Sequence, residues 1–278
     1  MQLGGMALRD GVLLLSERFW AAAVREADGD VHVHSGRRVQ LPGRDRMARV
    51  PLLRGMAKLA ESMAVLPDVR REVGVPVLPH EDPRILAYAA VGSVASTALR
   101  RSRGGPPLIK ELLIAALSLG PAMLAVRDSR LSAFHGAEHK SIAGYETGED
   151  AADSAKEHTR CGTNLLAPLA LTSVASNLAL RRAGVDRQPL AVLAAGLVSI
   201  GGAVEMFSWM ARHEGHPLAE LLRKPGIQLQ RVLTTREPSE AQLDVAQAAL
   251  SELLRLEDDK GQAGEAASEL AAGEPAMA

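Results

Sequence analysis

Cysteine is nearly absent from the sequence, aromatic residues are few, and neither sign of charge is in excess. Cys161 is the only cysteine among the 278 residues, so no disulfide can form within the chain. Its thiol is therefore free, a metal ligand or simply buried. Aromatic residues make up 3% of the chain and the net charge is −1, which gives neither base-stacking rings nor electrostatic attraction to nucleic acid. We therefore expect no nucleic-acid partner.

The N-terminal stretch also lacks the pattern of a signal peptide. It has no basic cluster before its apolar residues, and Asp10, Glu17 and Arg18 interrupt the apolar run. We therefore expect the N-terminal part of the chain to stay in the cytoplasm.

Charge is missing from four runs in the middle of the chain. These are residues 85–99, 112–126, 165–180 and 189–211, of which the last is interrupted only by Glu205. A helix of fifteen or sixteen residues rises only about 24 Å, less than the roughly 30 Å hydrocarbon core of a bilayer, so buried helices of a soluble bundle are an alternative. However, the runs are uncharged on all sides and end in arginine clusters, which is typical of membrane spans. We therefore predict about four spans.

One short stretch, FHGAEHK at residues 134–140, contains the most specific chemistry. If residues 132–141 are helical, His135 and His139 lie four apart on one face and can bind one metal ion. Glu138 is then placed to act on a water molecule at the metal. The pattern H-x-x-E-H is found in inverzincin metallopeptidases. Two histidines at this spacing are also common on solvated helices.

Three further residues could complete a metal site. His158 and Cys161 follow closely and are both ligand types that zinc accepts. Glu205 is costly in a membrane span unless it has a partner, so it is either a ligand or paired with an arginine or lysine of another helix. The ligand types indicate a divalent transition metal, with Zn²⁺ as the first choice.

Five sequence motifs resemble those of a known family. They are GGMALRDGV at residues 4–12, FHGAEHKSIAGYETGE at 134–149, HTRCGTN at 158–164, KPGIQLQ at 224–230 and TTREP at 234–238. In this order they resemble the YqhQ-like family, a bacterial domain-of-unknown-function family of predicted metal-dependent membrane enzymes. The resemblance spans most of the chain and implies a metal-dependent membrane protein, but says little about the substrate. The chain departs from the family pattern at Asp10, Leu15 and Thr159, where the family has Glu, Arg and Pro.

The predicted fold is mainly α, with a multi-pass helical membrane core and a small N-terminal subdomain that contains a β-hairpin. The hairpin comprises residues 19–25 and 31–34, and His32 and His34 lie on its polar face. We divide the chain into an N-terminal region (1–83), a membrane core (84–211) with a metal-site loop (127–164), an interfacial segment with a C-terminal amphipathic helix (212–257), and a disordered tail (258–278). A helix near 51–65, an irregular proline-rich linker after it, and a capping box at 239–242 complete the prediction.

The orientation in the membrane depends on two opposing signals. With four spans, the termini and the metal-site loop share one side, and the short loops 100–107 and 181–188 lie on the other. Six arginines make the short loops basic and would place them in the cytoplasm: Arg100, Arg101, Arg103, Arg181, Arg182 and Arg187. The missing signal peptide and the lone thiol favour the reverse, and we predict a multi-pass protein of the cell membrane with termini and metal site in the cytoplasm.

The function that these residues predict is metal-dependent hydrolysis at the cytoplasmic membrane face. His135, His139 and Cys161 bind the metal, Glu205 or His158 supplies a fourth group, and Glu138 takes a proton from water. Lys140 or Arg160 could hold an anionic group of the substrate, which is lipid-linked or a membrane protein. The first alternative is a non-catalytic membrane scaffold with a structural zinc site. The second is a small transporter, suggested by Glu205.

Overall fold

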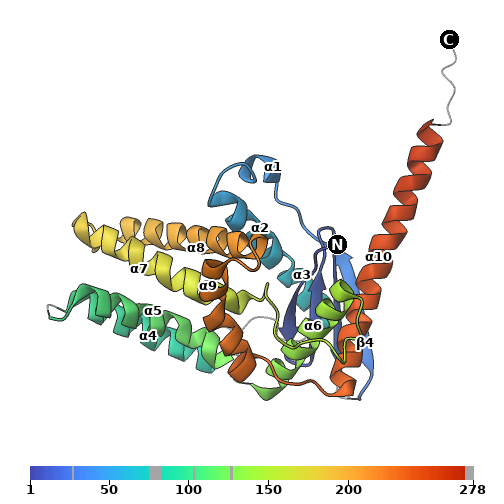
Figure 1. Cartoon of the computed structure of the whole chain (residues 1–278), viewed down its shortest axis with the longest axis horizontal. Coiled ribbons are helices and arrows are strands. Elements are labelled where there is room, and N and C mark those ends of the chain that lie inside the picture. Colours follow the sequence, from blue (N-terminus) through green and yellow to red (C-terminus); the bar gives the residue numbers. More distant parts are fainter. Residues whose placement is uncertain (27, 75–82, 103, 126–127, 273–278) are drawn as a thin grey trace, which may run out of the picture.

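The computed structural model describes residues 1–26, 28–74, 83–102, 104–125 and 128–272. It is mainly helical, with a small antiparallel sheet formed by the N-terminal residues. The sheet and two long helices form one end of the molecule, and four helices project from it as an arm (Figure 1). We call these four helices, α4, α5, α7 and α8, the helical arm.

The sheet is a meander in the order β1-β2-β3-β4. Its strands are β1 (Gly4–Leu8), β2 (Gly11–Leu15), β3 (Phe19–Arg25) and β4 (Val31–Arg37). The predicted hairpin is β3–β4 and is confirmed. β1 and β2 were not predicted. In β2, residues 12–14 are buried on both faces of the sheet and so lack the alternation that marks a half-exposed strand, and β1 begins with two glycines, which are weak strand formers.

Helices cover both faces of this sheet. On one face, α6 (Ser129–Thr147) and α10 (Glu240–Ala272) pack against alternate strand residues such as Val12, Leu14 and Ala21. On the other face lies α3 (Leu66–Val73). The residues 66–73 were predicted as the start of an irregular linker but are helical, and residues 75–82 of that linker lie outside the described residues. α6 is therefore enclosed between the sheet and the rest of the molecule.

The C-terminal helix α10 begins at the predicted capping box. The Ser239 N–H donates to Gln242 Oε1 at 2.9 Å, and the Gln242 N–H donates to Ser239 Oγ at 3.4 Å. The helix was predicted to end near residue 256, followed by a disordered tail, but it continues to Ala272. One reason is that Glu257, the next residue, accepts hydrogen bonds from Ser16 and Arg18 of the sheet region. Residues 273–278 of the predicted tail lie outside the described residues.

The helical arm corresponds to the four uncharged runs. Its helices are α4 (Pro83–Arg101), α5 (Pro107–Ala125), α7 (Leu166–Arg182) and α8 (Pro189–Arg212). Among the described residues, the segments Gly162–Arg182 and Pro189–Arg212 are long and apolar enough to cross a membrane. Two of the four predicted runs thus lie in helices that could span a membrane by their length and composition, and the other two do not meet this criterion.

Shorter elements occupy the junction between the arm and the sheet. α2 (Leu53–Ala64) lies against α8 and matches the helix predicted after Pro51, and α1 (Arg44–Met47) packs against α2. α9 (Pro217–Leu229) crosses the base of the arm (Figure 1). It contains Pro225 and leads into a turn of π-helix, Gln230–Thr234. This junction holds the candidate site.

Candidate metal centre

Helix α6 carries the two histidines into the interior of the protein. Its N-terminus is capped by Asp128, whose carboxylate accepts the N–H of Arg130 at 2.8 Å, and it ends at Gly148 in the left-handed conformation (φ 74°). Within it, residues 136–142 are all buried. The helix predicted for residues 132–141 is thus confirmed. Other segments of the protein cover all of its faces.

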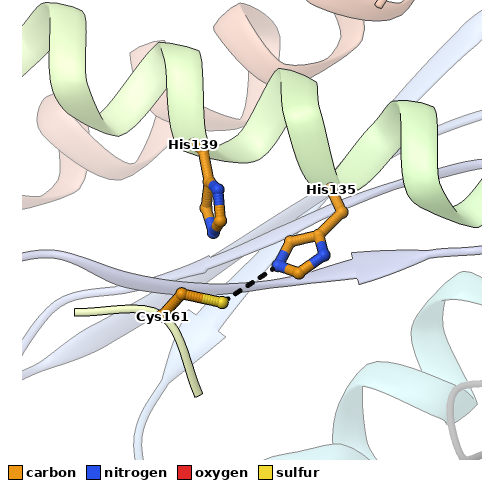
Figure 2. Close-up of side chains that lie close together, drawn as sticks. All are labelled: His135, His139 and Cys161. Atoms are coloured by element: carbon orange, nitrogen blue, oxygen red, sulfur yellow. Dashed lines mark hydrogen bonds between the residues drawn. The ribbon is translucent and has the colours of Figure 1, made fainter. Parts of the chain in front are cut away.

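The structure brings His135, His139 and Cys161 together. One ligand atom from each lies within 4.8 Å of the others, and His135 Nε2 is 3.4 Å from Cys161 Sγ (Figure 2). The three side chains point toward one another from α6 and from the loop that precedes α7 (Figure 2). We call this group the HHC cluster.

Backbone carbonyls orient both imidazoles of the HHC cluster. His135 Nδ1 lies 2.8 Å from the carbonyl oxygen of Thr234, and His139 Nδ1 lies 2.6 Å from that of Lys156. A carbonyl oxygen can only accept, so each Nδ1 carries the proton and each Nε2 has a free lone pair. Metal-binding histidines are held in the same way, with the second nitrogen donating to a carbonyl or carboxylate.

Glu138 lies beside the HHC cluster without a strong partner of its own. Its side chain is almost fully buried, and its nearest charged partner among the described residues is His135 Nε2, 3.9 Å from Glu138 Oε2. Burial raises the pKa of Glu138 to about 8, although His135 opposes the shift. Strand β1 passes directly over the carboxylate, because a Cβ added at Gly5 would lie 2.5 Å from Glu138 Oε1.

The donor set fits a divalent metal ion. Burial lowers the pKa of His139 well below its usual range, so its imidazole is neutral and able to bind a cation. Burial also raises the pKa of the Cys161 thiol, and a hydrogen bond from Thr163 opposes this shift. Two imidazoles and one sulfur, gathered in a buried place next to a carboxyl group, are the ligand types of zinc and related metals.

His158 lies next to the HHC cluster but does not belong to it. Its ring centroid is 5.6 Å from that of His139. Its Nδ1 accepts the N–H of Arg160 at 3.3 Å, and its Nε2 is 3.5 Å from Glu146 Oε2. His158 is therefore engaged with its own loop and with the end of α6.

Glu205 lies away from the HHC cluster, in α8. Its carboxylate accepts hydrogen bonds from Arg54 Nε at 2.7 and 3.0 Å and from the Leu52 N–H at 3.1 Å. It is the ion pair with another helix that the sequence left open as the alternative to a ligand. The two basic residues considered for substrate binding are also paired, Lys140 with Glu237 and Arg160 with Glu146.

The two histidines of the β3–β4 hairpin differ from the HHC cluster in their exposure to solvent. His32 is exposed and forms a second group of ligand-type residues with Glu26 and Asp28, which are exposed too. His34 is partly exposed on the same strand. This agrees with the expectation that both are solvated strand residues.

A glutamine that sequence reasoning did not single out holds the loop that carries Cys161. Gln230 Oε1 accepts the His158 N–H at 2.7 Å, while its Nε2 donates to the His158 carbonyl at 3.2 Å and to Thr163 Oγ1 at 2.8 Å. Thr163 in turn donates to Cys161 Sγ at 3.3 Å. Gln230 ends the motif KPGIQLQ, but nothing in the motif itself indicates that this glutamine holds a loop.

Two glycines permit the close packing of these segments. A Cβ at Gly226, in the same motif, would overlap Asn164 of the Cys161 loop, and a Cβ at Gly136 in α6 would overlap the carbonyl of Arg236. The five motifs, spread over the whole sequence, therefore meet around α6.

Comparison with known proteins identifies a family. A family described as "Protein of unknown function (DUF1385)" matches residues 116–256. The chain belongs to this family. It is also 26% identical over 297 residues to "Uncharacterized protein YqhQ" of Bacillus subtilis (strain 168), covering 91% of this chain and 92% of that protein. The resemblance to YqhQ-like proteins is thus confirmed. No solved structure matches the chain.

Proposed function

We propose that this protein is a membrane-embedded, metal-dependent hydrolase whose centre is the HHC cluster with Glu138. The observation that carries the proposal is the cluster itself, three ligand atoms within 4.8 Å of one another beside a buried carboxyl group that pairs with no lysine or arginine among the described residues. Structural zinc sites are closed by four protein ligands, whereas catalytic sites have three and leave a position for water or substrate. The cluster has three.

His135, His139 and Cys161 would hold the metal, most simply Zn²⁺. When bound, such an ion acts as a Lewis acid that polarises an oxygen atom of water or substrate. The carbonyls of Thr234 and Lys156 keep the two imidazoles in the tautomer that presents Nε2. The two Nδ1–H bonds would stay in place on binding, whereas the 3.4 Å contact between His135 Nε2 and Cys161 Sγ would give way to the ion.

Glu138 would move the proton. Its carboxylate removes a proton from the attacking water and returns it to the leaving group, a role that needs a carboxyl group with no fixed ion pair. Burial under Gly5 of β1 holds the side chain in place and limits the access of bulk water. A general base of this kind contributes typically about 10²- to 10⁴-fold to the rate.

We propose further that the whole helical arm lies in the bilayer. Its two candidate spans are only 11% and 22% buried within the protein, whereas the core helix of a soluble protein is mostly buried. Large apolar side chains are also exposed on the other two helices, among them Leu86, Val91, Val94, Leu108, Ile109, Leu112 and Leu113. The centre then lies at the membrane surface near the base of the arm, where a lipid-linked or membrane-protein substrate can reach it.

The rival function is a membrane scaffold with a structural metal site. The observation that favours it is the position of His158, whose ring is 5.6 Å from that of His139. A rotation of this side chain away from Glu146 would offer a fourth protein ligand and close the site. A transporter has less support, because Glu205 is paired with Arg54 and is not free to bind an ion.

Metal analysis combined with a Glu138→Gln variant tests the proposal. The purified protein should contain close to one zinc per chain, and His135→Ala with His139→Ala should lose it, while His32→Ala should retain it. Glu138→Gln should keep the metal and the fold but lose function in a complementation assay of a deletion strain. If Glu138→Gln complements fully while the ligand variants fail, the site is structural and the hydrolase is rejected.

A further inference from the structure

The strand next to Glu138 is an unprotected edge of the sheet. β1 pairs with β2 on one side only, and it contains no charged residue and no proline. Proteins normally protect such edges with lysine, proline, bulges or a covering element, since unpaired backbone groups attract other chains. The opposite edge strand, β4, carries two histidines and an arginine, so the two edges differ in protection.

The hydrogen-bond pattern of the sheet shows which groups of β1 face outward. The Ser16 N–H donates to the carbonyl of Phe19, so even-numbered positions of β2 bond to β3. The hydrogen-bonding direction alternates along an antiparallel strand. Leu14 therefore bonds to β3, and Gly5 opposite it, like Ala7, points its N–H and C=O away from β2. Within the described part of the chain, no hydrogen bond joins these outward groups to another residue.

This free edge lies at the candidate centre. Gly5 is exposed, yet its Cα faces Glu138 at a distance that leaves no room for a side chain. Glu138 is in turn 3.9 Å from the His135 imidazole of the HHC cluster. Strands pass behind the three clustered side chains in the close-up (Figure 2). Glu138 approaches Gly5 from the face of the sheet that α6 covers, and a chain paired with β1 would run about 4.8 Å from β1 in the plane of the sheet, next to this contact.

We propose that β1 binds the substrate, an extended polypeptide segment that adds a strand to the sheet at Gly5 and Ala7. This inference rests on the proposed hydrolase and specifies its substrate class. Backbone pairing of this kind is a common mode of peptide recognition. The reaction is peptide-bond hydrolysis, in which water gives its hydroxyl to the carbonyl carbon and the C–N bond breaks. Glu138 passes the proton of that water to the departing amine, so no further reactant is needed.

The test uses binding in the absence of turnover. The full-length Glu138→Gln protein, zinc-loaded and in detergent, is titrated with fluorescently labelled, reduced and carboxymethylated α-lactalbumin, which is permanently unfolded, and binding is read by anisotropy. Adding Ala7→Pro removes an outward N–H at the edge, where proline is compatible with the β1–β2 ladder. We expect binding at least about fivefold weaker, as for the loss of one hydrogen bond of about 1 kcal/mol.

Val33→Pro is the matched control, since this residue is on the β4 edge and its side chain is 41% exposed. It should leave binding unchanged. Because proline can also disturb folding, a second measurement uses the Glu138→Gln protein without the Ala7→Pro change. A random octapeptide library should compete with α-lactalbumin, and the same library with N-methylated backbone amides should not.

Four outcomes would overturn the inference. They are no binding of the unfolded protein or the library, equal binding by the Ala7→Pro variant, equal competition by the N-methylated library, and a stable dimer that Ala7→Pro converts to monomer, which would show that a second copy of the chain covers this edge. Zinc content and the Glu138→Gln complementation result are measured separately. A hydrolase with zinc that does not bind peptides at β1 would therefore retain the proposed function and refute only the substrate class.

Discussion

The roles of single residues at the candidate centre follow from what surrounds them. His135 and His139 each donate Nδ1–H to a backbone carbonyl, which no isolated pair of surface histidines would do. Glu138 has neither a hydrogen-bonding partner nor a salt bridge shorter than its 3.9 Å approach to His135 among the described residues. A buried carboxyl group of this kind reduces stability, so its retention beside three ligand-type residues points to a chemical role.

The pair of glycines at the start of β1 offers a sharp test of how Glu138 is positioned. Gly5→Ala places a Cβ 2.5 Å from Glu138 Oε1 and must displace the carboxylate, whereas a Cβ at Gly4 meets nothing within 4 Å. We expect Gly5→Ala to lower complementation or turnover by about tenfold or more while the metal stays bound, because small misplacements of a catalytic group reduce rates strongly. Gly4→Ala is the control and should behave as the parent. Equal behaviour of the two variants would show that β1 does not position Glu138.

At the scale of elements, the centre is assembled by a loop and a π-helical turn that both follow α6 in the sequence, about 70 residues apart, and pack back against it. Gln230 holds the Cys161 loop through the backbone of His158, and Thr234, in the same turn, holds His135. π-Helical turns occur frequently at functional sites, since the widened turn redirects backbone carbonyls. The position of Cys161 therefore depends on Gln230.

Gln230→Leu should weaken metal binding without changing any ligand. The variant removes three hydrogen bonds to His158 and Thr163, so the Cys161 loop is released. Loss of such supporting contacts typically lowers metal affinity about 10- to 100-fold. Competition with a zinc chelator measures the affinity, and Gln228→Leu, an exposed position in the same motif, is the control. Unchanged affinity in Gln230→Leu would show that the loop keeps its place without this glutamine.

The attachment of α10 to the sheet should depend on pH through Glu257. Burial opposes ionisation of this carboxyl group, but hydrogen bonds from Arg18 and Ser16 outweigh it, so the pKa is lowered in the folded state. The resulting stabilisation is present above the unfolded pKa of about 4.3 and is lost as the pH falls through the lower folded value. In thermal unfolding, Glu257→Gln should be less stable than the parent at neutral pH, and the difference should shrink below about pH 4. Asp258→Asn, at an exposed neighbour, should match the parent throughout.

At the scale of the whole molecule, the protein has an apolar part, the helical arm, and a polar part that holds the candidate centre (Figure 1). Both connections at the tip of the arm are basic, and the lone buried thiol lies at its base. The positive-inside rule would place the tip in the cytoplasm, whereas a reduced thiol ligand fits a cytoplasmic base. We propose the second orientation.

Fractionation and a topology reporter test the arrangement in the membrane. The protein should remain with membranes through a carbonate wash, since washing does not remove buried apolar helices. A fluorescent protein fused to the C-terminus should fluoresce, and an alkaline phosphatase fused there should be inactive, if the base of the arm is cytoplasmic. Recovery in the soluble fraction without detergent would reject the membrane arm, and the reverse reporter result would reject only the orientation.

Features that depend on local backbone geometry could be predicted from the sequence. The spacing of His135 and His139 places them on one face of any helix, and the uncharged runs, the β3–β4 hairpin and the capping box of α10 arise from neighbouring residues. Among the strands of the described residues, β1 and β2 were missed, because burial of β2 on both faces removes the alternation and the two glycines that begin β1 are weak strand formers.

Which distant residues lie next to His135 and His139 depends on tertiary packing. Cys161 lies with the two histidines because Gln230 folds its loop onto α6, while Arg54 of another helix binds Glu205 and Glu146 engages His158. The approach of Gly5 to Glu138 likewise depends on how the sheet packs against α6. Such choices reflect the packing of segments far apart in the chain, which periodicity does not encode.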